Sequence, residues 1–339
     1  MLLQEHVSLK NLNALGINAQ ARYYARIDDV QQLHQLLLNP QLNQRSRLIL
    51  GGGSNVLFLN DFVGVVIHMA IGGIAVVQED REHIWVRAGA GVNWHTLVLH
   101  CVQQGYAGIE NLSLIPGTAG AAPIQNIGAY GVTLSDVFES LEAIEVHSGT
   151  VHTFRSKDCA FGYRDSIFKN THREKYIITS VTLRLHKQPT FQTTYGTLQS
   201  TLEAMDVREL SIKAISDAVI RIRQSKLPDP AHLGNAGSFF KNPIIPQQQF
   251  EYLQHTHPDM PGYVQPGGYV KIPAAWLIEQ CGWKGKTRGA IGVHQQHALV
   301  LVNYGTGTGQ DIFRLAQDIQ QSVYQQFNIE IVPEVQVIS

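Results

Sequence analysis

Two glycine-rich loops are the segments of this chain best suited to hold a phosphorylated ligand. The first, Gly51-Gly52-Gly53-Ser54-Asn55, follows the strand-like run 47–50. Glycine lets the backbone adopt positive φ and approach a ligand closely, and Ser and Asn add hydrogen-bond donors. The loop is neither a Rossmann fingerprint, because Val56 replaces the third glycine, nor a P-loop. A tight turn between strands explains this segment equally well.

The second loop, residues 115–131, contains four glycines and two prolines and no charged residue. If such a loop is buried, its backbone groups must bond to a ligand or to neighbouring chain. Two loops of this kind suit a long dinucleotide, whose pyrophosphate and ring system need separate binding segments. A buried structural loop remains the alternative.

Three side chains elsewhere could act on such a ligand's reaction partner. Arg164 is a permanent, planar cation that suits a carboxylate, although an ion pair with Asp165 would also explain it. Ser238 follows Gly237, and its hydroxyl is a weak acid; a serine that caps a turn explains it on the sequence alone. Glu334 is expected in an apolar terminal strand, 329–338, where burial would raise its pKa and let it share a proton. A water-facing edge residue is the alternative there.

Composition excludes several classes of protein. The 339 residues include 26 Lys+Arg and 27 Asp+Glu, so no basic field exists for nucleic acid or an anionic membrane. Three separated cysteines argue against a disulfide framework and predict a reducing compartment. The apolar run 65–77 is interrupted by His68 and Gly72-Gly73, and the N-terminus lacks a signal-peptide pattern. We therefore expect a cytoplasmic protein.

Paired histidines do not predict a metal centre. His294 with His297, and His255 with His257, have metal-like spacing, but no third ligand is clustered with either pair. We therefore expect no metal site.

Hydrophobic periodicity predicts an α+β fold with uneven alternation of strands and helices. Strands are expected at 47–50, 56–59, 63–69, 74–77, 84–87 and 329–338. Helices are expected after the N-cap Asn93 up to Gly105, around 212–222, from Pro273 at N1 to Gly282, and around 312–323. Domain boundaries are expected near 70 and 228, which gives domains 1–70, 71–227 and 228–328, with the terminal strand 329–339 returning to the middle one.

Eight segments, taken together, resemble the UDP-N-acetylenolpyruvoylglucosamine reductase family. They are LGGGSNVLF (50–58), AGAGVNWHTLV (88–98), ENLSLIPGTAGAAPIQNIGAYG (110–131), CAFGYRDSIFK (159–169), YGTL (195–198), KLPDP (226–230), GNAGSFFKNP (234–243) and PEV (333–335). The resemblance spans nearly the whole chain in the expected order. It implies that the first two domains form a vanillyl-alcohol-oxidase-like (PCMH-type) FAD-binding fold and the third an α+β substrate-binding domain.

The resemblance also implies an activity in peptidoglycan biosynthesis. NADPH would reduce FAD, and the flavin would reduce the enolpyruvyl group of UDP-N-acetylglucosamine-enolpyruvate, a small-molecule substrate, to UDP-N-acetylmuramate. The protein would act as a monomer. Ser238 would be the proton donor, and Arg164 and Glu334 would stabilise the enolate-like intermediate.

The implied ligand contacts divide between cofactor and substrate. The FAD-binding residues would be Gly51, Gly52, Gly53, Ser54, Asn55, Pro116, Gly117, Thr118, Gly120, Ala121, Gln125, Asn126, Gly128, Tyr130, Gly131 and Ile178. The substrate would contact Tyr195, Lys226, Asn242, Tyr263 and Lys284, and the Tyr195 loop is that of the family form with an extra substrate-binding loop. Two departures, His297 where some members have Gln and Gln336 where an Arg contacts flavin, put details of these contacts in question.

Two other functions remain open. A flavin-dependent oxidase with the same FAD-binding fold would need a His or Cys placed for covalent flavin attachment, and His95 and Cys101 do not match that pattern. A non-enzymatic nucleotide-binding module would give no reason for Ser238 and Glu334 to lie together.

Overall fold

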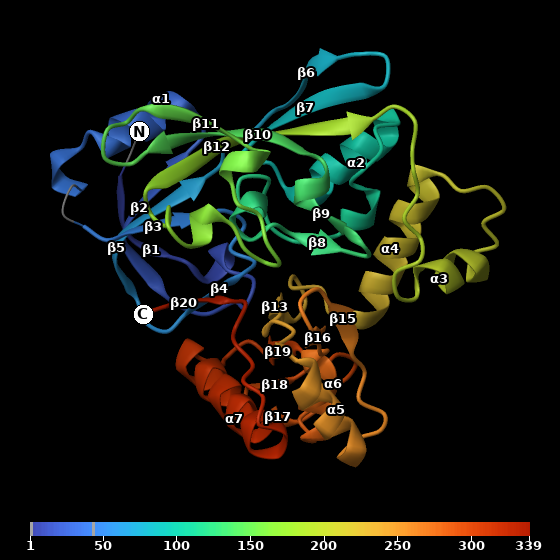
Figure 1. The fold of residues 1–339 in the computed structure, drawn as a ribbon. Helices are drawn as coiled ribbons and strands as arrows, with labels where there is room; N and C mark the ends of the chain where they lie inside the picture. The colour runs from blue at the N-terminus through green and yellow to red at the C-terminus, as the bar shows by residue number, and fades with distance from the viewer. Residues whose placement is uncertain (1–2, 43–44) are drawn as a thin grey trace. The chain divides into compact units, whose positions relative to one another are not determined.

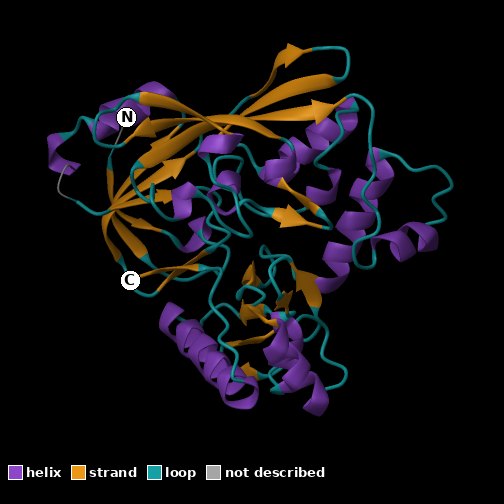
Figure 2. Ribbon diagram, viewed as in Figure 1, coloured by secondary structure: helices purple, strands orange, loops and turns teal. Residues whose placement is uncertain are grey.

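The computed structural model describes residues 3–42 and 45–339 (Figures 1 and 2). The chain divides into two compact units that are interleaved in sequence. The first unit comprises Met1–Val7, Ala21–Gly52 and Val63–Ser225, and the second comprises Ser8–Gln20, Gly53–Phe62 and Lys226–Ser339. Each unit therefore draws on segments far apart in the chain.

One sheet of the first unit has the strand order β1-β2-β5-β3. Its strands are β1 (Gln4–Ser8), β2 (Gln20–Ile27), β5 (Phe62–Met69) and β3 (Arg47–Leu50). β3 runs parallel to β5, with Leu48 opposite Val66. Alternate residues of β2 and β5, including Ala25 and Ile67, pack against helix α1 (Val30–Leu37), whose Leu33 and Leu36 are buried in the same cluster.

The second sheet of the first unit is five-stranded and antiparallel, with the order β11-β10-β12-β7-β6 (Figure 1). Its strands are β6 (Ile74–Glu79), β7 (His83–Gly89), β10 (Phe138–Glu145), β11 (Val151–Arg155) and β12 (Tyr176–His186). Helix α2 (Trp94–Gln104) buries Trp94, Leu97, Val98 and Cys101 against it. This packing fixes the start of α2, to which the second glycine-rich loop is hydrogen-bonded.

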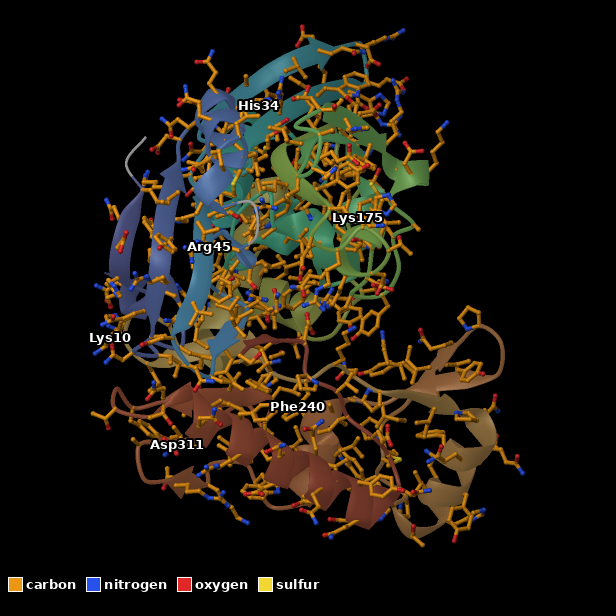
Figure 3. The ribbon with its side chains drawn as sticks, turned by 90° about the vertical axis from the view of Figure 1, so that its left-hand side faces the viewer. Lys10, His34, Arg45, Lys175, Phe240 and Asp311 are labelled. Atoms are coloured by element: carbon orange, nitrogen blue, oxygen red, sulfur yellow. The ribbon has the colours of Figure 1, made fainter. Side chains whose placement is uncertain are left out.

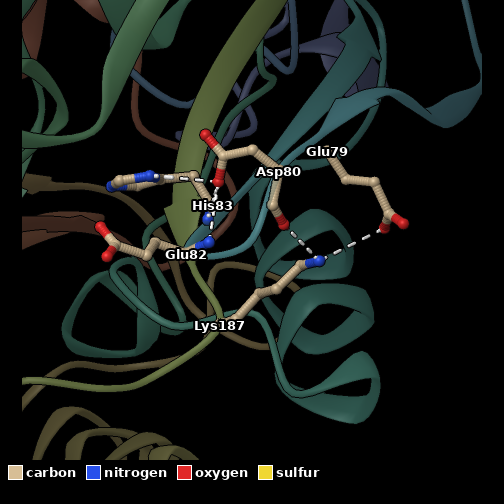
Figure 4. A network of polar contacts seen from close by, with 5 residues as sticks. All are labelled: Glu79, Asp80, Glu82, His83 and Lys187. Atoms are coloured by element: carbon tan, nitrogen blue, oxygen red, sulfur yellow. Dashed lines mark hydrogen bonds and ion pairs between the residues drawn. The ribbon is translucent and has the colours of Figure 1, made fainter.

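The β6–β7 hairpin is closed by the polar network of Figure 4. The Asp80 carboxylate accepts hydrogen bonds from the backbone N–H groups of Glu82 (2.8 Å) and His83 (2.7 Å). Lys187, just after β12, donates to the Asp80 carbonyl at 2.7 Å and lies 3.6 Å from the Glu79 carboxylate. The network is exposed, so it orders the turn more than it stabilises the fold.

The rest of the first unit is helical and irregular. Helix α3 (Leu198–Ala204) and helix α4 (Ile212–Lys226) pack together, and β8 (Gly128–Ala129) pairs with β9 (Val132–Thr133). Short 3₁₀ helices of the chain span Lys10–Leu12, Pro40–Leu42, Glu110–Leu112, Ala122–Gln125, Leu134–Asp136, Ser156–Asp158 and Ile167–Lys169.

The second unit contains two small sheets, a two-stranded pair and three helices. The sheets are β13-β19-β18-β17 (Gly234–Ser238, Val300–Asn303, Ile291–Val293, Thr287–Arg288) and β14-β16-β15 (Ile244–Pro246, Tyr269–Lys271, Tyr263–Gln265). The helices are α5 (Gln247–Thr256), α6 (Ala274–Gln280) and α7 (Gly309–Phe327). Thr308 and Asp311, the latter labelled in Figure 3, form a capping box that begins α7.

Several predicted elements are confirmed. Asn93 caps α2 by accepting the Thr96 N–H, and Gly105 ends the helix in the left-handed conformation at φ 78°. The α+β class is confirmed as well. Pro273 lies at the N-cap of α6 rather than at N1. Within the described residues, no helix combines the length and the apolar character that crossing a membrane requires.

The predicted strand 329–338 is wrong over most of its length. Only β20 (Gln336–Ile338) is extended, and it pairs in parallel with β4 (Val56–Phe58), not with a strand of residues 71–227. Pro333 has no N–H and makes only an isolated bridge to Phe240, so a continuous ladder cannot form there. The division into three domains stays a prediction.

Candidate active site

The two glycine-rich loops meet inside the first unit. A Cβ at Gly51 would lie 2.5 Å from the Thr118 Oγ1, and a Cβ at Gly52 would lie 3.2 Å from the Gly117 Cα. Neither position accepts a side chain without movement of the other loop. Gly117 itself has φ 113°, which favours glycine. The glycines therefore allow two backbones to lie close together, which the sequence alone attributed to ligand approach.

The second loop is held by backbone bonds to the start of α2. Gly117 accepts from the Trp94 N–H at 3.0 Å, the Ala119 N–H donates to Val92 at 2.8 Å, and the Gly120 N–H donates to Ala90 at 2.9 Å. A Cβ at Gly120 would lie 2.5 Å from that of Ala90. These bonds fix the loop beside Gly51 and Gly52 without a ligand.

One side chain of this loop, that of Thr118, carries a polar group that is not satisfied within the protein. Its side chain is buried, yet its hydroxyl has no hydrogen-bond partner. A buried unsatisfied hydroxyl costs about 1–3 kcal/mol, so natural structures keep one only for a reason such as a ligand. Beside two glycine backbones, the hydroxyl is a suitable donor to a phosphate oxygen of FAD. The residues present therefore fit the cofactor.

Replacing Thr118 with valine is expected to separate stability from cofactor affinity. The shape is kept and an unsatisfied hydroxyl is removed, so the apoprotein should be at least as stable in urea. FAD should bind about tenfold to a hundredfold more weakly, because a bond to a charged group is lost. Flavin fluorescence titration measures this. The control is Thr179→Val, which removes a hydroxyl already bonded to the Glu142 carbonyl at 3.1 Å and should lower stability without changing FAD affinity.

The later part of the second loop brings Arg164 into the site. The Arg164 Nη2 donates to the Gly128 carbonyl at 2.6 Å, and Arg164 has φ 54°, a conformation that costs energy for a non-glycine residue. The Asn126 amide is used internally: it bonds to Ser135 and to the Gly162 carbonyl. Asn126 therefore ties the predicted flavin loop to the segment that carries Arg164.

The other predicted flavin residues of the first unit lie along the same framework. Tyr130 has φ 48° and Gly131 has φ 83°, both in the turn between β8 and β9. Ile178 is buried in β12 opposite Ala143. Pro116, Ala121 and Gln125 lie in the loop between Ile115 and Asn126.

Arg223 on α4 is a cation that sequence reasoning missed. Its Nε donates to the Leu114 carbonyl at 3.2 Å, and no ion pair to a carboxylate is made by it within the described residues. Burial lowers the pKa of Arg223, Tyr130 opposes this shift, and the charge of Arg164 adds to it. Helical periodicity predicted the helix around 212–222, and nothing in its sequence signalled that Arg223 lies near the charge of Arg164.

His95 shares this neighbourhood and gives a pH-dependent prediction. Its Nδ1 accepts the Leu114 N–H at 2.9 Å, and burial, followed by the charge of Arg223, lowers the pKa of His95 below 6.5. As pH falls below about 6.5, the unfolded chain binds more protons than the folded one. The unfolding free energy therefore decreases as pH falls from about 6.5 to the lower pKa of folded His95. We expect His95→Asn to reduce the loss of unfolding free energy between pH 7.5 and 5. Selective ¹³C-histidine NMR identifies the His95 signal as the one that is absent from the His95→Asn spectrum. In the unaltered protein this imidazole should still be mostly neutral near pH 6.5, and a signal titrating at or above 6.5 contradicts the prediction.

In the second unit, Ser238 and Glu334 lie on adjacent backbones. The Glu334 N–H donates to the Phe239 carbonyl at 2.8 Å, one residue after Ser238, and Phe240 (labelled in Figure 3) bridges to Pro333. Ser238 ends β13 after Gly237, which has φ 66°, and both Phe239 and Phe240 are buried. This predicted pair is therefore together, although Glu334 precedes β20 instead of lying within a strand.

Asn55, a predicted flavin residue, joins this pair. Its Nδ2 donates to the Glu334 carbonyl at 3.2 Å, and the Gln336 N–H donates to the Asn55 carbonyl at 3.0 Å. Gly53 is equally confined, since a Cβ there would lie 1.9 Å from the Leu12 carbonyl oxygen. Ser54 stands between them. Residues 53–55 are thus structural in the second unit whatever they bind.

The predicted substrate residues lie on both units. Tyr195, on the first, is 52% exposed; on the second, Tyr263 is 54% exposed and Lys226 is exposed at the end of α4. The Asn242 Oδ1 accepts the Ala274 N–H at 2.9 Å, which caps α6, and the Lys284 Nζ lies 2.9 Å from the Glu279 carboxylate. Asn242 and Lys284 therefore already have protein partners.

The predicted departure His297 is partly buried. Its Nδ1 accepts the Leu299 N–H at 3.3 Å. This bond favours the tautomer that carries a proton on Nε2.

Comparisons with known proteins agree with this framework. The family model for the UDP-N-acetylenolpyruvoylglucosamine reductase C-terminal domain matches residues 229–338, and an FAD binding domain model matches residues 21–155. A UDP-N-acetylenolpyruvoylglucosamine reductase of Amoebophilus asiaticus is 58% identical over 338 residues, covering 100% of both chains. That of Flavobacterium johnsoniae is 45% identical over 339 residues, again covering 100% of both.

A solved structure shares the fold. The UDP-N-acetylenolpyruvylglucosamine reductase of Thermus caldophilus matches with a TM-score of 0.68 and 23% identity, covering 100% of both chains. The resemblance inferred from the motifs is confirmed, as is the FAD-binding fold. With two profiles and full-length relatives in agreement, the chain belongs to the UDP-N-acetylenolpyruvoylglucosamine reductase family of FAD-dependent oxidoreductases.

Proposed function

We propose that the protein uses NADPH and bound FAD to reduce the enolpyruvyl group of UDP-N-acetylglucosamine-enolpyruvate, giving UDP-N-acetylmuramate. The family supports enolpyruvyl reduction with FAD in peptidoglycan synthesis. The structural observation that carries the residue assignment is the bond from the Glu334 N–H to the Phe239 carbonyl, which holds Ser238 and Glu334 on neighbouring backbones.

FAD, when bound, supplies the hydride that adds to the methylene carbon of the substrate. The adjacent carbon then bears negative charge that is delocalised into its carboxylate. The Arg164 guanidinium pairs with that carboxylate and stabilises the charge, and Glu334 shares a proton with the intermediate. The Ser238 hydroxyl gives its proton to the adjacent carbon, which completes the reduction, and a proton from solvent then restores the Ser238 hydroxyl.

The cofactor and substrate would be held by the chain's own donors. Thr118 and the glycine backbones at 51–53 and 117 would bind the pyrophosphate of FAD, and Ser54 and Asn55 would add further donors. Tyr195, Lys226, Asn242, Tyr263 and Lys284 bind the nucleotide-sugar portion of the substrate. We further propose a cytoplasmic monomer.

An anaerobic assay in two steps tests the proposal. NADPH should bleach the flavin absorbance, and the enolpyruvyl substrate, added after NADP⁺ is removed, should restore it. Restoration by oxygen but not by this substrate would favour the flavin-dependent oxidase instead. Because the steps are separate, a missing first step would reject NADPH as the reductant without rejecting the substrate.

A further inference from the structure

The segment 110–114, which is buried at residues 110–113, connects several parts of the first unit. The Trp94 Nε1 donates to the Leu112 carbonyl at 3.1 Å, and the Ser113 hydroxyl contacts the Ser216 hydroxyl of α4 at 2.8 Å. Asn111 differs from its neighbours because it bonds to two separate loops. One loop carries Tyr130, a proposed FAD contact, and the other carries Tyr195, a proposed substrate contact.

The Asn111 side chain bridges these loops with one amide group. Its Nδ2 donates to the Tyr130 carbonyl at 2.9 Å and to the Gln192 carbonyl at 2.8 Å. Asn111 is 1% exposed, so water cannot readily replace either bond. The amide has two N–H donors, and two carbonyls accept from its nitrogen, so the donors of Asn111 are both used.

Two further contacts join the same loops. Phe191, beside Gln192, and Tyr130 both pack against one apolar cluster formed by Leu198, Leu202, Ile215, Ala218, Val219 and Ile222. A Cβ at Gly131 would lie 3.5 Å from the Cβ of Tyr195, so the two chains are in van der Waals proximity. The segment 187–197 is therefore anchored at 191–192, and Tyr195 lies over the turn that follows Tyr130.

We propose that Asn111 is a positioning residue that holds the Tyr195 segment on the flavin loop, so that Tyr195 is preorganised for the substrate. The inference rests on the proposed function, because it takes Tyr195 to contact the substrate. Without the amide, residues 187–197 sample more conformations, and substrate binding must supply the ordering that Asn111 otherwise provides.

The test combines Asn111→Ala with Tyr195→Ala in a double-mutant cycle. Asn111→Ala alone should raise the KM for the enolpyruvyl substrate about tenfold, as expected for losing bonds worth roughly 1.4 kcal/mol. Flavin reduction by NADPH should change little. In the Tyr195→Ala background, the further rise in KM should be less than about twofold, because the residue being positioned is gone.

Ser113→Ala is the matched control. It removes a buried hydroxyl from the same segment, one that bonds to the Glu110 carbonyl at 2.7 Å and to Ser216 but not to residues 187–197. It should lower the melting temperature without raising the KM. An equal KM rise in Ser113→Ala, or an Asn111→Ala effect that persists undiminished without Tyr195, overturns the positioning role.

Hydrogen exchange keeps this inference separable from the proposed function. Asn111→Ala should speed amide exchange across 188–197, and Ser113→Ala should not. If the reduced flavin of the unaltered protein is not reoxidised by the substrate, the proposed function fails, while the exchange result still decides whether Asn111 anchors the segment. Unchanged exchange in Asn111→Ala rejects the anchor itself.

Discussion

Ser238→Ala is expected to leave flavin reduction by NADPH intact and to slow substrate-dependent reoxidation by ~10²–10⁴, the usual cost of losing a general acid. This corresponds to roughly 3–5.5 kcal/mol of barrier. The hydroxyl is held where Gly237 and the buried Phe239 and Phe240 fix the backbone, so the alanine variant should keep its local structure. Stopped-flow absorbance under anaerobic conditions measures both half-reactions in one preparation.

A matched serine gives the control for this experiment. Ser322 lies on α7 of the same unit, and its hydroxyl donates to the Asp318 carbonyl at 2.8 Å within that helix rather than to the segments that carry Ser238 and Glu334. Ser322→Ala should leave both half-reactions unchanged. If Ser238→Ala reoxidises at the normal rate, Ser238 is not the proton donor and another acid must be sought.

The largest effect on stability is expected from Gly53→Ala. Gly53 has φ 60°, and its Cβ would lie 1.9 Å from the Leu12 carbonyl oxygen. Leu12 cannot move freely, because the Asn13 amide next to it bonds to Leu9 (2.8 Å) and Ile17 (3.0 Å) and Ala14 bonds to Gly53. A left-handed alanine costs about 1–2 kcal/mol and overpacking about 1–3, so unfolding free energy should fall by about 2–5 kcal/mol.

Urea unfolding of the FAD-free protein checks this prediction, since it excludes any contribution from lost cofactor. Gly72→Ala is the control: Gly72 has no atom within 4 Å of its Cβ position and no positive φ, and its replacement should stay within about 0.5 kcal/mol. Equal unfolding free energies of Gly53→Ala and Gly72→Ala would contradict the prediction, because residues 12–14 would then move aside at little cost.

Local elements could be predicted from the sequence because their signals are local. Asn93 and Gly105 bound α2 where capping rules place them, and β3 has the predicted range Arg47–Leu50. The predicted strand 329–338 is too long because the apolar character of the segment continues across Pro333, where a strand ladder does not. Its pairing with β4 depends on residues almost a whole chain away, which no local pattern reports.

The sequence predicted only part of the candidate site. Motif resemblance pointed to Ser238 and Glu334, whose backbones do lie together, and to Gly51 and Thr118, which pack against each other. It gave no role to Asn111 or Arg223, because their hydrogen-bond partners are backbone carbonyls that are reached only in three dimensions. It also read Gly53 as a ligand contact when the structure already requires glycine there.

The pairing of β4 with β20 bears on how the protein is made. Asn55 and Glu334 are bonded partners separated by 279 residues, and ribosomes add ~5–20 residues per second, so the early strand waits about 14–56 s for its neighbour. During that time Val56, Leu57 and Phe58, all buried in the finished protein, lack their β20 partner. Chaperone demand should therefore concentrate on this early apolar strand during translation.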